Sequence, residues 1–332
     1  MQSRFLPDKM TLMLLTTVAA ASLFPAQGAV AAGLKYVTVF MIGLLFFLHG
    51  AKLSRAAVIA GATHWRLHLL VLLCTFALFP VLALLFEPAI LLLLTPELYL
   101  GILFLCLLPS TVQSSIAFTA AAKGNVPAAV CSASLSSLLG IFLTPLLVSV
   151  AMPAAAGASA SLDAVLAIVL QLLLPFIAGQ VARRWIGGWV DSHKSLVKAV
   201  DQGSILLVVF SAFSAAVVAG LWSKVPLVML GSLIVVCIVL LALVIVTVTW
   251  VARRCGFSKA DEATIVFCGS NKSLATGIPL AHVLIPAASI SMIVLPLMLF
   301  HQVQLLLCAV IAGRYARRAL PAHETRIVAD RA

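Results

Sequence analysis

The chain has 332 residues, of which 63% are hydrophobic and only 9% are charged, and its mean hydropathy is +1.20. Soluble domains carry about 25% charged residues, so this composition excludes a soluble globular protein and predicts an integral membrane protein. The net charge of +11 requires no nucleic-acid partner. Basic loops beside a lipid bilayer with anionic headgroups are enough to explain it.

Apolar segments long enough to span a bilayer as helices, about 17 to 25 residues each, follow one another along the whole chain. We count ten of them, at residues 10–26, 34–51, 67–86, 98–122, 127–151, 163–183, 201–221, 226–251, 261–285 and 288–313. The connections between them are too short for a soluble domain. We therefore expect an all-α polytopic membrane protein whose residues 1–332 form a single transmembrane domain.

The first apolar segment has two interpretations. Arg4 and Lys9 precede it and the small residues Val30, Ala31 and Ala32 follow it, a pattern that also fits a cleavable signal peptide. The length of the segment and its place in a set of ten favour a retained helix. Both interpretations stay open at this point.

Lysine and arginine residues are divided unequally between the two sides of the predicted membrane domain. Lys35 and Lys224 fall on one side, Lys272 lies within a segment, and all other basic residues fall on the opposite side. Positive charge marks the cytoplasmic side of membrane proteins. We therefore expect both termini to be cytoplasmic, with a basic tail over residues 314–332.

Ten helices divide into two sets of five, and an odd number per set makes the second set enter the membrane from the opposite side. The sequence therefore predicts two inverted repeats, at about 10–151 and 163–313. The fourth segment of each set carries a polar interruption, at Pro109–Ser115 and at Gly269–Ser273. Proline and glycine both disfavour a helix interior. We expect broken helices four and nine that cross near the middle of the bilayer.

Each interruption exposes the end of one half-helix and the start of another. The starts carry positive partial charge that suits an anion, and the ends suit a cation. Kinks that serve only helix packing are the alternative, but two polar interruptions at matching places favour a binding site. The candidate binding residues are Ser110, Thr111, Gln113, Ser114, Ser115, Ser270, Asn271, Lys272, Ser273 and Thr276.

The last segment contributes three further polar side chains, those of His301, Gln302 and Gln304. Polar groups at this depth need partners. Hydrogen bonds between helices are the favoured interpretation, and contact of His301 and Gln302 with a ligand is the alternative.

The middle of each segment lacks aspartate and glutamate, and the seven cysteines show no paired spacing. A carboxylate proton relay, a metal site and the known hydrolase patterns therefore lack their residues. We expect no metal, no cofactor and no enzymatic activity.

Three stretches of the sequence carry a family resemblance. They are Pro109-Ser-Thr-Val-Gln-Ser-Ser with Lys123-Gly-Asn-Val, Phe267-Cys-Gly-Ser-Asn-Lys-Ser-Leu-Ala-Thr-Gly-Ile-Pro, and Leu299-Phe-His-Gln. They resemble the bile acid:sodium symporter superfamily, most closely the divergent branch that contains the seventh member of solute carrier family 10 and many bacterial proteins. The resemblance covers nearly the whole chain. It implies a core domain with crossed helices four and nine, a panel domain against which the core moves, and a bacterial inner (plasma) membrane.

The resemblance also implies sodium ligands that this chain lacks. Where sodium-coupled members carry ligand side chains, it has Val266 and Ser270 in helix nine and Ala129 and Ala133 in helix five. We therefore expect degraded sodium sites. Three roles are open for Lys272: a fixed cation near the sodium position that helps to hold an anionic substrate, a titrating group that couples transport to protons, or a structural charge bonded to helix-four carbonyls.

Two functions follow from these patterns. The first is a secondary-active transporter of a small organic, anionic solute that works by alternating access. The alternative is a membrane regulator or scaffold of ion homeostasis that transports nothing. A scaffold has no need of polar interruptions in mid-membrane, so the first function is favoured. The sequence makes no prediction of oligomeric state.

Overall fold

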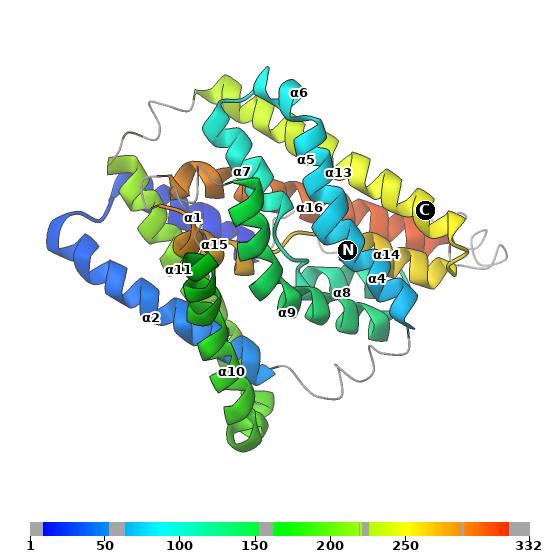
Figure 1. Ribbon diagram of the computed structural model, residues 1–332, viewed down its shortest axis with the longest axis horizontal. Coiled ribbons are helices and arrows are strands. Elements are labelled where there is room, and N and C mark those ends of the chain that lie inside the picture. Colours follow the sequence, from blue (N-terminus) through cyan, green and yellow to red (C-terminus); the bar gives the residue numbers. More distant parts are fainter. Residues whose placement is uncertain are drawn as a thin grey trace, which may run out of the picture.

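The computed structural model describes residues 9–52, 64–152, 162–218, 220, 226–286 and 289–318. Throughout these ranges the regular elements are helices (Figure 1). The predicted all-α class is therefore confirmed. The last helix continues to Arg318, and the rest of the predicted basic tail lies outside the described residues.

The helices occupy the predicted apolar segments in order. They are α1 (Lys9–Leu23), α2 (Gly28–Lys52), α4 (Trp65–Leu73), the π-helix η2 (Cys74–Leu78), α5 (Phe79–Leu85), α6 (Glu87–Leu91), α7 (Pro96–Cys106), α8 (Val112–Ala121), α9 (Val126–Ala151), α10 (Leu162–Ser192), α11 (Lys194–Val218), α13 (Leu227–Arg254), α14 (Lys259–Ser270), α15 (Leu274–Leu284) and α16 (Ile290–Arg318). Within the described ranges, six helices are long and apolar enough to cross a membrane by length and composition alone. Their presence supports an integral membrane protein.

Helix four is interrupted earlier than the sequence predicts. Helix α7 ends at Cys106 and α8 begins at Val112, whereas the prediction centred on 109–115. The reason is Pro109, which has no N–H and restricts the residue before it, so the helix ends ahead of the proline. In helix nine, α14 ends at Ser270 and α15 begins at Leu274, inside the predicted interruption.

The third predicted segment also departs from a regular α-helix, because η2 inserts a π-turn between α4 and α5. The N–H of Phe79 donates to the carbonyl of Cys74, five residues earlier. The next residue, Pro80, has no N–H. Neither residue therefore serves the carbonyl of Thr75 within this helix. Single π-turns of this kind occur frequently at functional sites.

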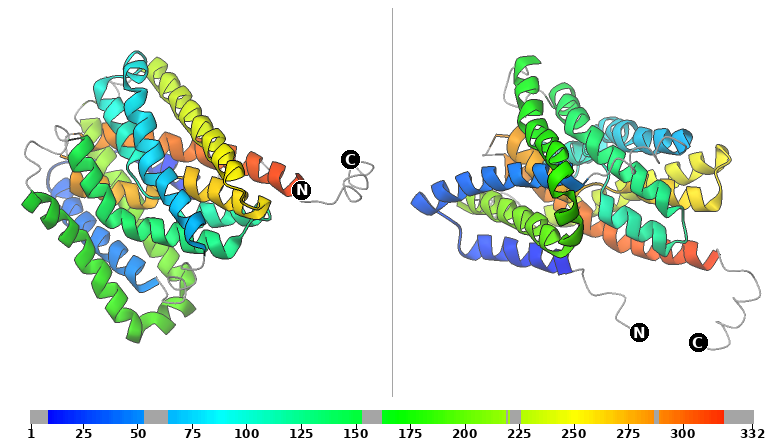
Figure 2. Two further views of the ribbon diagram at one scale, coloured as in Figure 1. Left: turned by 45° about the vertical axis from the view of Figure 1, so that its right-hand side comes forward. Right: turned by 90° about the horizontal axis from the view of Figure 1, so that it is seen from below.

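The helices form two groups. The first, which we call the four-helix group, consists of α1, α2, α10 and α11, which pack on one another. The second, the crossing group, contains α4 to α9 and α13 to α16. The groups lie side by side in Figure 1 and in the right-hand view of Figure 2. They touch where α11 packs against α15 and α16, and where α10 packs against α9.

Within the four-helix group, two glycines allow α2 and α10 to approach closely. A Cβ atom at Gly179 of α10 would lie 1.9 Å from the carbonyl oxygen of Phe47, and one at Gly50 of α2 would lie 2.0 Å from that of Phe176. No side chain fits at such distances. Small residues serve this purpose in membrane proteins, because close backbones gain van der Waals contact.

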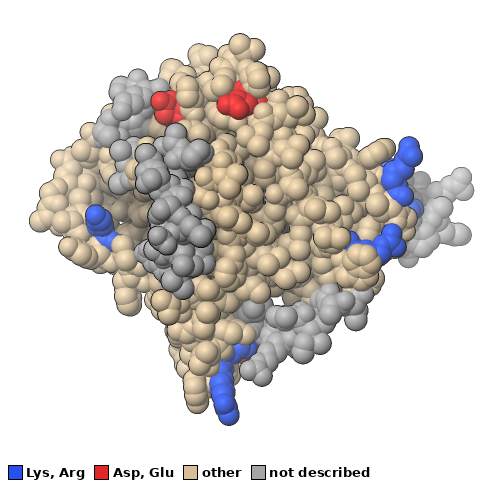
Figure 3. All heavy atoms as spheres, in the orientation of Figure 1, with Lys and Arg blue, Asp and Glu red and all other residues tan. Residues whose placement is uncertain are grey.

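Charged side chains lie toward the edges of the molecule. Figure 3 shows Lys and Arg at the right and lower edges and at one place on the left, acidic side chains at the top, and a broad uncharged surface between them. Such a surface can face the hydrocarbon of a bilayer, where charged groups are costly.

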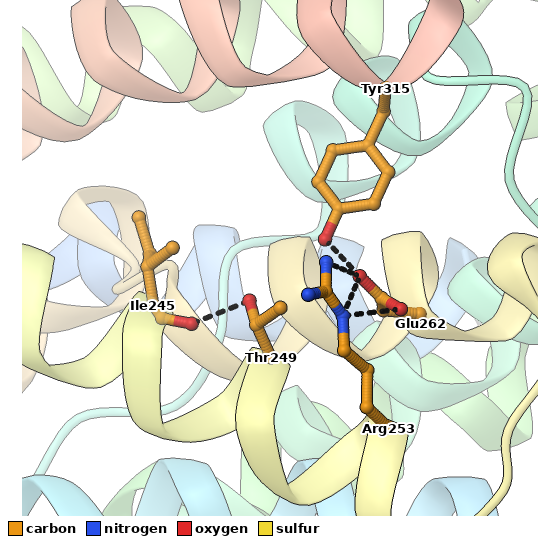
Figure 4. Close-up of polar contacts among 5 residues, drawn as sticks. All are labelled: Ile245, Thr249, Arg253, Glu262 and Tyr315. Carbon is orange, nitrogen blue, oxygen red and sulfur yellow. Dashed lines mark hydrogen bonds and ion pairs between the residues drawn. The ribbon is translucent and has the colours of Figure 1, made fainter. Parts of the chain in front are cut away.

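One charged cluster fixes the first half of helix nine to its neighbours (Figure 4). Glu262 of α14 accepts hydrogen bonds from Arg253 of α13, at 2.9 to 3.1 Å, and from the Tyr315 hydroxyl of α16, at 2.7 Å. In the same first turn of α14, the Asn125 amide donates to Asp261 at 2.9 Å. Helix α14 is thus held at its first turn from three directions.

Candidate functional site

The two interruptions meet at the centre of the crossing group. The N–H of Ser273 donates to the carbonyl of Pro109 at 3.0 Å. Thr111 and Asn271 both have extended backbone, with ψ of 140° and 145°. The predicted contact between the interrupted helices is therefore present, and two short extended segments form it. We call residues 107–111 and 271–273, with the side chains bonded to them, the crossing site.

Hydroxyl groups of helix four close the open end of α14. Ser110 donates through its Oγ to the carbonyl of Cys268 at 2.6 Å, and Ser115 donates to that of Phe267 at 3.0 Å. The last carbonyls of a helix have no partner inside it. The Asn271 amide in turn donates to the Ser115 hydroxyl at 3.2 Å. Three predicted site residues therefore act here as partners of the protein's own backbone and of one another.

Side chains of a later helix bond the backbone of each interruption: α9 does so for helix four, and α16 for helix nine. The N–H of Ser110 donates to the Ser136 hydroxyl of α9 at 3.0 Å, and Ser137 donates to the Ser110 carbonyl at 3.5 Å. In helix nine, the N–H of Lys272 donates to Oε1 of Gln304 at 2.8 Å, and Nε2 of Gln304 donates to the Lys272 carbonyl at 3.0 Å. One glutamine thus satisfies both backbone groups of Lys272, so the predicted hydrogen bonding between helices is present for Gln304.

The Lys272 side chain is buried completely and its ammonium group is fully bonded. Its Nζ donates to three backbone carbonyls, those of Thr75, Cys106 and Leu108, each at 2.7 Å. The ring centre of Phe79 lies 4.2 Å from the same atom. An ammonium group has three N–H donors. This arrangement therefore uses all of them on the protein's own backbone, which favours the structural role among the three predicted for Lys272.

The electrostatics of the surrounding helices explain how a buried cation is accommodated. Cys106 is the last residue of α7, and Leu108 lies two residues after it. Both carbonyls are therefore at a helix C-terminus, where the partial charge is negative. Thr75 contributes a carbonyl that the π-turn and Pro80 leave without a donor in its own helix. Neither Thr75 nor Phe79 was a predicted site residue, since only Pro80 marks this place in the sequence.

The remaining predicted residues lie around the crossing site with different exposure. Ser273 caps α15 by accepting from the Thr276 N–H at 3.1 Å, and its hydroxyl donates to that of Thr276 at 3.0 Å. His301 contacts the Gln304 amide through Nδ1 at 3.0 Å. The other predicted residues differ in exposure: Thr111 and Gln302 are half-buried, Gln113 is exposed, and Ser270 is fully buried.

Ser114 differs from its neighbours. Its hydroxyl oxygen is buried, and among the described residues it has no hydrogen-bond partner. It lies in the first turn of α8, one residue after the exposed Gln113. The buried Ser270 hydroxyl likewise has no partner among the described residues, and an unused hydroxyl beside the start of a half-helix, such as that of Ser114, is available to a bound molecule.

Of the four positions implied for sodium ligands, Ser270 has a buried hydroxyl and the other three have hydrocarbon side chains. Val266, Ala129 and Ala133 are fully buried hydrocarbon side chains without an oxygen atom. Near them, the Cys268 thiol lies 3.8 Å from the carbonyl of Ala129. His68 and Ser132 also fill this region between α4 and α9, with 2.6 Å between Nδ1 and Oγ.

Comparisons with known proteins agree with this architecture. A sequence model of the SBF-like CPA transporter family matches residues 8–317. A protein of Pseudomonas aeruginosa without a described function is 64% identical over 95% of each chain. YfeH of Escherichia coli, named as a candidate symporter, is 57% identical over 94% of this chain and 93% of its own. The mouse sodium/bile acid cotransporter 7 is 27% identical over 90% of this chain and 89% of its own.

These matches confirm the predicted resemblance to the bile acid:sodium symporter superfamily. They also confirm that the chain is not an enzyme, because the family consists of transporters. Together with the apolar helices, they establish an integral membrane protein. The family model and the high identity to bacterial relatives extend over almost the entire sequence. The chain therefore belongs to the SBF-like CPA transporter family.

Proposed function

We propose that this protein is a secondary-active transporter that carries a small organic anion across a bacterial inner membrane by alternating access. The observation that supports it most is the crossing site, where two interrupted helices meet in a buried, polar region. Irregular backbone at this depth is tolerated where it is buried in protein or lines a cavity. Discontinuous helices at the bilayer midplane are where secondary transporters bind their solutes.

The proposal includes ten membrane helices arranged as two inverted repeats, with both termini in the cytoplasm. The hydrogen bonds of the crossing site support the repeats. Ser110 is bonded by α9, and Lys272 is bonded by α16, so each interruption is fixed by the next helix of its own half. The four-helix group corresponds to the panel and the crossing group to the core in this scheme.

An anionic substrate is proposed because of the two half-helix starts. Helix α8 begins at Val112 and α15 at Leu274, and both starts lie at the crossing site. The positive partial charge at a helix N-terminus attracts anions. Ser114 and Gln113 are our candidates for substrate contact, since one has an unused hydroxyl and the other is exposed. The substrate would bind beside the starts of α8 and α15.

The proposal further holds that transport does not require sodium. Three implied sodium positions carry only hydrocarbon, and the Lys272 ammonium supplies a positive charge that belongs to the protein itself. Protons remain as a coupling ion to be tested.

Uptake by reconstituted protein tests these statements. The purified chain is placed in liposomes and supplied with a panel of radiolabelled organic anions, with sodium or choline as the external cation and with or without a pH gradient. We expect saturable uptake of at least one anion at equal rates in sodium and choline. Ser114→Ala should raise the KM for that anion, and Ala117→Ser, which changes an exposed position of the same helix, is the control. A strict sodium requirement would refute the sodium statement. Lack of uptake across the panel, with folded protein, would refute anion transport.

A further inference from the structure

The partners of the Lys272 ammonium come from three separate parts of the chain. Thr75 belongs to η2, Cys106 ends α7, and Leu108 lies in the helix-four interruption. Their three carbonyl oxygens are all 2.7 Å from Nζ, and the Phe79 ring covers a further side. Carbonyl oxygens and an aromatic face are two groups that proteins use to bind monovalent cations.

These three oxygen atoms accept no hydrogen bond from their own helices, and the cause lies in the backbone and not in the lysine. The Cys106 carbonyl belongs to the last residue of α7 and the Leu108 carbonyl lies just beyond it, where a helix cannot supply donors. The Thr75 carbonyl is left by the π-turn, in which Phe79 donates to Cys74 and Pro80 has no N–H. The backbone therefore creates the oxygen cluster, and the lysine side chain enters it.

The distances indicate the size of ion that this cluster fits. Oxygen atoms lie about 2.0–2.1 Å from magnesium and about 2.3–2.6 Å from calcium in proteins. Sodium has nearly the ionic radius of calcium, whereas potassium and ammonium are larger. A separation of 2.7 Å from all three oxygens therefore fits the larger monovalent ions.

We propose that the Thr75, Cys106 and Leu108 carbonyls and the Phe79 ring form a monovalent-cation site of potassium or ammonium size, which the Lys272 ammonium fills permanently. The site then holds a covalently attached ion in place of an exchangeable one. This inference rests on the proposed function in one consequence only: if the protein is a transporter, no mobile cation at this site takes part in the transport cycle. The binding of cations by the site itself can be measured without a substrate.

Removal of the lysine side chain tests the site by chemical rescue. Lys272→Ala leaves space for the lost three carbons and ammonium, which propylammonium reproduces. The full-length variant is unfolded thermally in detergent with the chlorides of lithium, sodium, potassium, ammonium, propylammonium or choline at equal ionic strength. We expect potassium, ammonium and propylammonium to raise the midpoint by about 2 °C over choline, the shift that a cation at about ten times its Kd gives a chain of this size. The wild type should show no such difference among salts.

Lys272→Met is the matched control, because its apolar side chain occupies the space of the lost carbons without a charge, and we expect no rescue by propylammonium. If Lys272→Ala does not fold in choline, the fraction of monodisperse protein extracted in potassium, propylammonium and choline gives the same comparison. Equal behaviour of Lys272→Ala in all salts, rescue of Lys272→Met, or a preference for lithium and sodium would overturn the proposal. None of these outcomes bears on whether the wild type transports an anion, which the liposome assay decides separately.

Discussion

Gln304→Leu removes both hydrogen bonds that fix the backbone of Lys272. The N–H and the carbonyl of Lys272 lie 2.8 and 3.0 Å from the Gln304 amide, and the whole glutamine side chain is buried. Leucine has a similar volume, so little packing is lost. The two backbone groups are left buried without partners, and each such group costs about 1–3 kcal/mol. We therefore expect the free energy of unfolding to fall by roughly 2–6 kcal/mol.

Chemical denaturation in detergent, followed by circular dichroism, measures this loss. Gln113→Leu is the matched control, since it makes the same replacement at an exposed position of α8 and should change stability by no more than about 0.5 kcal/mol. Gln304→Glu retains the acceptor for the Lys272 N–H and loses one donor, so its effect on stability should differ from that of leucine. If Gln304→Leu were as stable as the wild type, the amide would not fix the interruption, and our reasoning about the crossing site would be wrong.

Three further variants test other contacts by the same measurement. Gly179→Ala places a Cβ 1.9 Å from the Phe47 carbonyl and should lower stability by about 1–3 kcal/mol, whereas Gly188→Ala in the same helix meets nothing within 4 Å and should have little effect; equal results would contradict the close α2–α10 packing. Glu262→Gln should lower stability by roughly 1 kcal/mol because it weakens a partly exposed ion pair, and the loss should shrink at high salt; a loss that salt leaves unchanged would rule out an electrostatic cause. Ser115→Ala removes the hydroxyl that donates to the Phe267 carbonyl and accepts from the Asn271 amide. We expect the free energy of unfolding to fall by about 1–3 kcal/mol, unless a water molecule takes the place of the hydroxyl.

Much of the fold follows directly from the sequence. Long apolar segments must form helices in a bilayer, because unpaired backbone groups have no water to bond there. Pro109 marks the interruption of helix four, since a proline ends the preceding helix by its own geometry. The run from Gly269 to Ser273 marks that of helix nine through polar residues in an apolar segment. Such local rules act within a few residues, so the sequence shows them.

The partners of Lys272 were decided by the tertiary structure. Its charge could be located from the sequence, but Thr75 is distant along the chain, and its contribution is a backbone carbonyl that every residue possesses. Which carbonyl groups lack a donor depends on a π-turn and on where helices end. Which of them meet one ammonium group depends on how those helices pack. Gln304 is a partial exception, since an amide in an apolar helix indicates that a partner exists, although only the folded chain shows that the partner is the backbone of Lys272.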